Sequence, residues 1–149
     1  MVRSIVIAII FISVCMVGVM INKNKKKRLE FFKDFQTYLN FADDGIRNVR
    51  KAKTEINKAV LPLVHRDFQD YLNDSRIPKY LNNDEKNNLD DFFSRFGQSD
   101  LECTLTLVSD EKIQVGVKVD ECEKDLKNKG GMITKLCILG GIALVILLV

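Results

Sequence analysis

The chain has few of the residues from which active sites and metal centres are usually built. Its 149 residues include one histidine, two prolines and no tryptophan. None of the four cysteines has metal-ligand spacing, which argues against a zinc site. Cys103 and Cys122 would lie about 28 Å apart on one continuous helix, beyond the reach of a disulfide. Thiols without a pairing pattern fit a reducing compartment.

No catalytic set is evident either. His65 has no serine or cysteine in a nucleophile motif near it. The pairs Asp43-Asp44 and Asp90-Asp91 occupy adjacent positions, which point in different directions on a helix. Gly130-Gly131 and Gly140-Gly141 lack the lysine and the spacing of a phosphate-binding loop. We therefore expect no enzymatic activity, no metal and no cofactor.

Charge is absent from both ends of the chain. Residues 4–22 are uncharged, and a helix needs about 20 apolar residues to span a bilayer. A cleaved signal peptide is the alternative, but the run is too long, no small-x-small cleavage site follows, and the positive charge comes after the run. We predict an N-terminal transmembrane anchor over 1–22. The basic cluster at 23–28 then places the following residues in the cytoplasm.

The C-terminal end is also apolar. Residues 136–149 carry no charge and would span about 21 Å as a helix, or about 27 Å from Met132 if Lys135 snorkels to the interface. A buried terminal helix is the alternative, but no polar face remains after Lys135. We predict a transmembrane segment over 131–149. It contains small residues that indicate either a helix-packing surface or ordinary glycine tolerance in lipid, namely Gly140, Gly141 and Ala143.

Helical periodicity runs through the part in between. Apolar residues from Leu29 to Val60 recur at steps of three or four, which predicts one helix of nearly 50 Å that ends before Pro62. Because Phe31 and Phe32 point to opposite sides, we expect some aromatic surface to be left for a partner. A short amphipathic helix over Val64–Leu72 and a connector over 76–81 follow.

The next helix and its end are marked by local signals. Asn83 or Asp84 is expected to cap it. One buried helical stripe is predicted from the spacing of Leu89, Phe92, Phe93 and Phe96. Gly97 follows, and glycine readily adopts the left-handed conformation that often ends a helix. Ser99 and Glu102 match a capping box for a further helix. The sequence predicts a helical hairpin whose corner is a candidate partner-binding surface, formed by Phe96, Gly97, Gln98, Ser99 and Asp100.

Residues 103–119 fit two structures. Their alternating Thr and Val would suit a β-hairpin. A heptad-spaced stripe from Leu101 to Leu126, broken at Lys112, favours a helix. The capping box and the helical pattern of 120–128 decide for the helix. The predicted fold is thus all-α: an antiparallel helical bundle over 29–130, flanked by two transmembrane helices.

The charge of this middle part bears on its partners. Residues 29–131 hold 16 basic and 20 acidic side chains, a net charge of −4. Nucleic-acid binding needs a basic face, so we expect no nucleic-acid partner.

Several ordered features resemble the stage III sporulation protein AB family of endospore-forming bacteria. They are the N-terminal anchor with Gly18 near its exit, the basic run ending Arg28-Leu29, the long helix before Pro62-Leu63, the Phe96–Asp100 corner, and the tail from Lys129-Gly130-Gly131-Met132 to Leu148. The corner is similar to a Phe/Leu-Gly-x-x-Asp pattern and the tail to Leu-Gly-x-x-Gly-x-x-x-x-x-x-Leu. Residues 60 to 88 depart most from the family pattern.

The resemblance implies a cytoplasmic bundle similar to that of type II secretion platform proteins. It implies a two-pass component of a transenvelope channel in the mother-cell membrane facing the forespore. It also implies partners, namely a cognate cytoplasmic secretion-type ATPase and other channel proteins, and is compatible with homo-oligomerisation. One alternative is a two-anchor membrane adaptor unrelated to sporulation. A di-metal membrane enzyme would need Glu/His pairs at i, i+3, which His65 does not supply.

Overall fold

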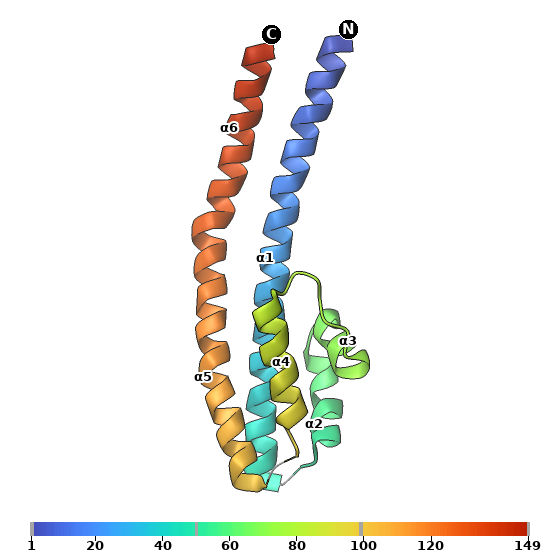
Figure 1. The fold of residues 1–149 in the computed structure, drawn as a ribbon, viewed down its shortest axis with the longest axis vertical. Coiled ribbons are helices and arrows are strands. Elements are labelled where there is room, and N and C mark those ends of the chain that lie inside the picture. The colour runs from blue at the N-terminus through green and yellow to red at the C-terminus, as the bar shows by residue number, and fades with distance from the viewer. Residues whose placement is uncertain (1, 50, 99, 149) are drawn as a thin grey trace. The chain divides into compact units, whose positions relative to one another are not determined.

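The structure is a computed structural model whose backbone is described for residues 2–49, 51–98 and 100–148. No strand occurs in these ranges, which confirms the all-α prediction and the helix over 103–119 (Figure 1). In chain order the elements are α1 (Val2–Val49), α2 (Lys53–Val60), the 3₁₀ turn η1 (Leu61–Leu63), α3 (Arg66–Asp74), α4 (Asn83–Arg95), α5 (Leu101–Asp125), the π-helical turn η2 (Leu126–Gly130) and α6 (Gly131–Leu148).

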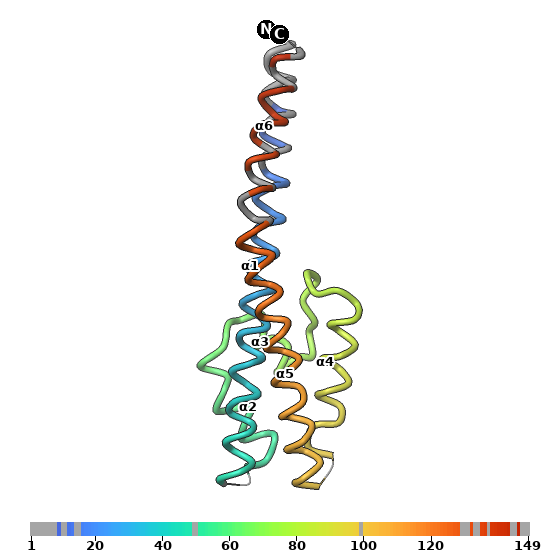
Figure 2. Tube along the Cα trace, turned by 90° about the vertical axis from the view of Figure 1, so that its left-hand side faces the viewer, coloured from blue at the N-terminus to red at the C-terminus, as the bar shows by residue number. Residues whose placement is uncertain are grey.

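The chain divides into two compact units. One is Arg28–Glu121, and the other joins the N-terminal part up to Lys27 with the part from Cys122 onward. The boundaries therefore fall inside α1 and α5. Within the terminal unit, the start of α1 runs beside α6 in both views (Figure 1 and Figure 2). Among the described residues, no helix combines the length and apolar character that crossing a membrane requires.

The first long helix ends earlier in the chain than predicted. The expected continuous helix over 29–60 is wrong, because α1 ends at Val49 and α2 begins at Lys53. The Tyr38 hydroxyl donates to Asn57 Oδ1 over 2.8 Å, and Asp34 accepts from the backbone N–H of His65 over 2.9 Å. Because later residues of the second segment meet earlier residues of α1, the chain folds back antiparallel to it.

No glycine or proline between 49 and 53 announces this reversal. Tertiary packing therefore overrides local helix propensity here. The Lys51 N–H donates to the Gly45 carbonyl over 3.1 Å across the turn, and the reversal buries Ile56 and Val60. As predicted, α2 stops before Pro62, which lies in η1.

An aromatic cluster forms the centre of the Arg28–Glu121 unit. Phe31 and Phe32 are 1% and 6% exposed, so the expectation that the two could not both be buried is wrong, although Phe41 does leave aromatic surface exposed. The Phe31 ring packs edge-on against Phe68 of α3, with centroids 5.1 Å apart. Phe32 lines a cavity of about 40 Å³ together with Leu89 of α4 and Val115 of α5. Both neighbours are buried because other helices cover two sides of α1.

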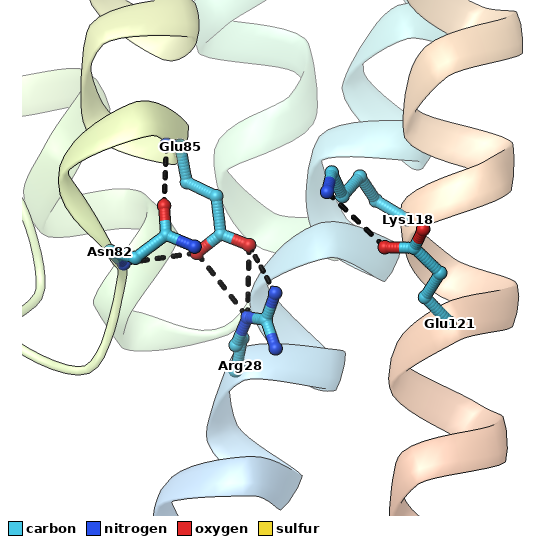
Figure 3. A network of polar contacts seen from close by, with 5 residues as sticks. All are labelled: Arg28, Asn82, Glu85, Lys118 and Glu121. Carbon is cyan, nitrogen blue, oxygen red and sulfur yellow. Dashed lines mark hydrogen bonds and ion pairs between the residues drawn. The ribbon is translucent and has the colours of Figure 1, made fainter.

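A buried carboxylate joins α1 to the start of α4 (Figure 3). Glu85 accepts from Arg28 Nε over 3.0 Å and forms an ion pair with the Arg28 guanidinium. It also closes a capping box with Asn82, whose side chain accepts from the Glu85 N–H over 2.8 Å. The cap is thus Asn82 rather than the predicted Asn83 or Asp84, because Glu85 stands three residues after Asn82. Figure 3 also shows Lys118 paired with Glu121 on α5.

Replacing Glu85 should therefore be costly. We expect Glu85→Ala to lower the free energy of unfolding by about 2–4 kcal/mol, because it removes a cap and leaves the Arg28 charge without this partner. Glu102→Ala is the matched control, since Glu102 is exposed in the first turn of α5 and should change stability by less than about 0.5 kcal/mol. Chemical denaturation of the purified chain measures both, and equal effects would contradict the role of Glu85.

Candidate functional site

The corner between α4 and α5 closes with a type II turn. Phe96 has φ −65° and ψ 117°, and Gly97 has φ +85°. The Gln98 N–H donates to the Arg95 carbonyl over 3.2 Å. A type II turn needs a positive φ at its third residue, which glycine adopts without strain. The left-handed glycine predicted at this position is confirmed.

The start of α5 has a different cap from the one predicted. The side chain of Asp100 accepts from the Cys103 N–H over 3.2 Å, and its carbonyl accepts from the Thr104 N–H over 3.0 Å. Asp100 is therefore the N-cap of the helix that begins at Leu101. The predicted capping box rests on Ser99, which lies outside the described residues.

Lys53 of α2 holds the corner in place. Its Nζ donates to the Phe93 carbonyl over 2.6 Å, which satisfies one of the free carbonyl groups at the end of α4. The same ammonium lies 5.6 Å and 5.8 Å from the ring centroids of Phe93 and Phe96. Burial lowers the pKa of Lys53.

The predicted partner-binding residues divide into core and surface. Phe96 is 2% exposed and stacks on Phe92 with centroids 5.3 Å apart, so its side chain belongs to the core. Gly97, Gln98 and Asp100 are exposed. A shallow pocket of about 270 Å³ borders the corner, with Lys53, Leu101 and Thr104 in its lining. The surface available to a partner is therefore the turn itself and the beginning of α5.

The small residues predicted to pack in lipid lie on α6. Gly140 and Ala143 are exposed and Gly141 is buried. A Cβ at Gly140 would meet no heavy atom within 4 Å. A packing role for these three residues stays a prediction.

His65 forms a pair with Asp34. Its Nδ1 lies 3.0 Å from Asp34 Oδ1, and the nearly buried Asp34 also accepts from the His65 backbone N–H. The hydrogen bond to Asp34 and its charge raise the pKa of His65, with smaller contributions from Glu30 and Asp67. The pair connects α1 to the start of α3. In the part of the chain that the structure describes, no cluster of three or more metal-ligating side chains occurs.

Sequence reasoning missed the polar residues that fix these elements. The sequence around Lys53 does not distinguish it from the other polar residues of its helix. The sequence around Asp34 likewise does not distinguish it from an exposed charged residue. Lys112 interrupts the apolar stripe of α5, and its Nζ lies 3.0 Å from Asp43 Oδ2 on α1. The charge that interrupts the stripe was the one sequence feature that could have predicted this contact, because a charged side chain at a core position needs an oppositely charged partner nearby.

Comparison with known proteins gives one match. The family model described as stage III sporulation protein AB matches residues 63–149, more than half of the chain. No curated protein and no solved structure matches significantly. The matched residues include α3, α4, the corner, α5, η2 and α6.

The positive φ of Gly97 leads to a matched pair of substitutions. Gly97→Ala should lower the free energy of unfolding by about 1 kcal/mol or more, because alanine is strained at this φ. The added Cβ would itself meet Lys53 only at 3.7 Å, so the cost is conformational. Gly116→Ala, inside α5 with open space around it, should instead raise stability by up to about 1 kcal/mol. Denaturation curves of both variants test this, and effects of the same sign would contradict the turn geometry.

The His65–Asp34 pair predicts a pH dependence of stability. Because the folded-state pKa of His65 is raised, its contribution is fully present below the unfolded pKa of about 6.5 and is lost as pH rises through the folded-state pKa. The effect should be small, since the His65 side chain is 66% exposed. Thermal unfolding should show the wild-type advantage over His65→Gln shrinking from about pH 5.5 to about pH 8.5. Parallel pH curves would exclude the linkage.

Proposed function

Because the chain belongs to the stage III sporulation protein AB family, we propose that it is a non-enzymatic platform of a sporulation channel in the mother-cell membrane. In this role it docks a cytoplasmic secretion-type ATPase and couples it to membrane proteins of the channel. The observation that carries the proposal is the division of the chain. The two terminal parts, which contain the apolar runs 4–22 and 136–149, form one unit, and the helices between them form another.

Exposed apolar side chains support a membrane location for the terminal unit. Soluble monomers rarely expose contiguous apolar patches of this kind. In the proposal these side chains face lipid, and the basic cluster at 23–28 keeps the middle of the chain on the cytoplasmic side. The side chains that are more than half exposed are Ile9, Ile12, Met16, Val17, Val19, Met20, Met132, Leu136, Leu139 and Ile146.

The helical unit is suited to transmitting force. Its two boundaries both continue into the terminal unit, so a load applied to its helices would reach the membrane through two connections. Its buried polar side chains hold helices together: Glu85 joins α1 to α4, and Asp34 joins α1 to the start of α3. In the proposal the exposed turn at Gln98 and Asp100 belongs to the ATPase contact.

Binding to the cognate ATPase tests the function directly. The full chain in nanodiscs should bind the purified ATPase in a surface-based binding assay. Gln98→Lys should weaken the affinity by about three- to tenfold, because it places a charge on the exposed turn of the corner. Asn73→Lys, an exposed substitution on α3, is the matched control and should leave affinity unchanged. If the wild-type chain does not bind the ATPase, the platform role is wrong.

A further inference from the structure

Two large apolar side chains are exposed on the outer face of α5. Ile113 and Val117 are 67% and 55% exposed and stand one helical turn apart. Gly116 lies beside them, and a Cβ there would meet no heavy atom within 4 Å. Glycine weakens a helix relative to alanine, and no contact within the unit requires it at this position. An apolar stripe beside a glycine with empty space around it is a surface that another helix can approach closely.

An acidic groove runs along the same face between α4 and α5, which lie side by side (Figure 2). The groove has a volume of about 620 Å³, and Cys103, Leu107 and Gln114 form part of its lining. Its lining contains four carboxyl side chains, Asp91, Glu102, Asp110 and Glu111, and one basic side chain, Arg95. Arg95 already pairs with Asp91 over 3.2 Å, so the remaining carboxylates give the groove a negative charge.

The charge of the surrounding sequence has the same sign. Residues 83–121 contain ten acidic and four basic side chains, a net charge of −6, whereas residues 28–82 carry a net charge of +2. Negative charge is thus concentrated on α4 and α5. Within the groove, burial and the nearby Asp91 raise the pKa of Glu111, so a cation beside it would favour its ionised form.

We propose that this face, the groove with the Ile113–Val117 stripe beside it, receives an amphipathic helix of a protein partner. The partner's apolar side lies on Ile113 and Val117, its backbone passes close to Gly116, and its lysine or arginine side chains enter the groove. From Glu102 to Gln114 the groove is about 18 Å long, enough for three turns of a helix. The inference rests on the proposed function only in taking the occupant to be a protein.

Two other occupants fit the charges less well. Asp110 and Asp120 flank the apolar stripe, so a second copy of the chain would bring acidic side chains to an acidic face. Anionic lipid headgroups would meet the same repulsion. Charge complementarity therefore selects a basic partner.

A designed peptide tests the inference without the ATPase. The probe is a fluorescent helix of about 16 residues, roughly 24 Å long, with an alanine and leucine stripe and lysine elsewhere. Its affinity is measured for the full chain in nanodiscs of zwitterionic lipid, after subtraction of its binding to empty nanodiscs. The wild-type chain should bind it, more weakly as salt increases, and should not bind the same peptide with glutamate in place of lysine.

Variants separate the groove from net charge. Asp110→Lys with Glu111→Lys should weaken peptide binding by at least about tenfold. The control is Asp44→Lys with Asp74→Lys, which makes the same charge change at exposed sites on α1 and α3 and should alter affinity by less than about twofold. Gly116→Leu should weaken binding while leaving α5 at least as stable, because it blocks close approach and improves helix propensity.

Three results would overturn the inference: equal effects of the two double variants, unchanged binding by Gly116→Leu, or a concentration-dependent dimer that Ile113→Ser abolishes. The same variants tested against the cognate ATPase distinguish this inference from the proposed function. Groove variants that lose peptide binding but keep ATPase binding would support a docking face separate from the ATPase contact at the corner and leave the platform role intact. Peptide binding without any ATPase binding would refute the platform role and keep the docking face.

Discussion

Burial of the aromatic rings on α1 is the constraint on which the Arg28–Glu121 unit depends. Phe31, Phe35 and Tyr38 are each 2% exposed or less, and their rings occupy more than one side of the helix. A single neighbouring helix could not cover all of them. The chain meets this requirement by turning back after α1, so that Phe68 of α3 packs on one side and Phe93 of α4 stacks on Phe35, with centroids 5.8 Å apart.

Polar contacts then fix where each helix lies against that core. Apolar packing is largely non-directional, whereas a buried carboxylate requires a partner at a defined position. Asp34 positions the start of α3, and Glu85 positions the start of α4. Lys53 donates a hydrogen bond to a backbone carbonyl at the end of α4. Lys112 does the same for α5 through Asp43. The start of α3, the start of α4 and α5 thus each have an ionic contact with α1 that sets their register.

Local signals made part of this fold predictable. The period of the apolar residues gave the helices, Pro62 ended α2, and Gly97 marked the turn after α4, because each depends on a few neighbouring residues. The reversal after Val49 was not predicted because no residue there disfavours a helix. The break is stabilised only by aromatic contacts between residues that are distant in the sequence. Lys53 and Asp34 were missed for a similar reason, since their partners lie 40 and 31 residues away in the chain. At the corner, the helical spacing correctly predicted the burial of Phe96, and Gln98 and Asp100 are exposed.

The proposed role requires the helical unit to be held at both ends, and cleavage of the chain in the membrane tests this most directly. A protease site is inserted into the connector between α3 and α4, where Arg76 and Lys79 are exposed. Membranes containing the chain are treated with protease and then washed with alkaline urea, which removes fragments held only by protein contacts. If both ends are anchored, the N-terminal and the C-terminal fragments should both sediment with the membranes. Release of either fragment into the supernatant would contradict the account.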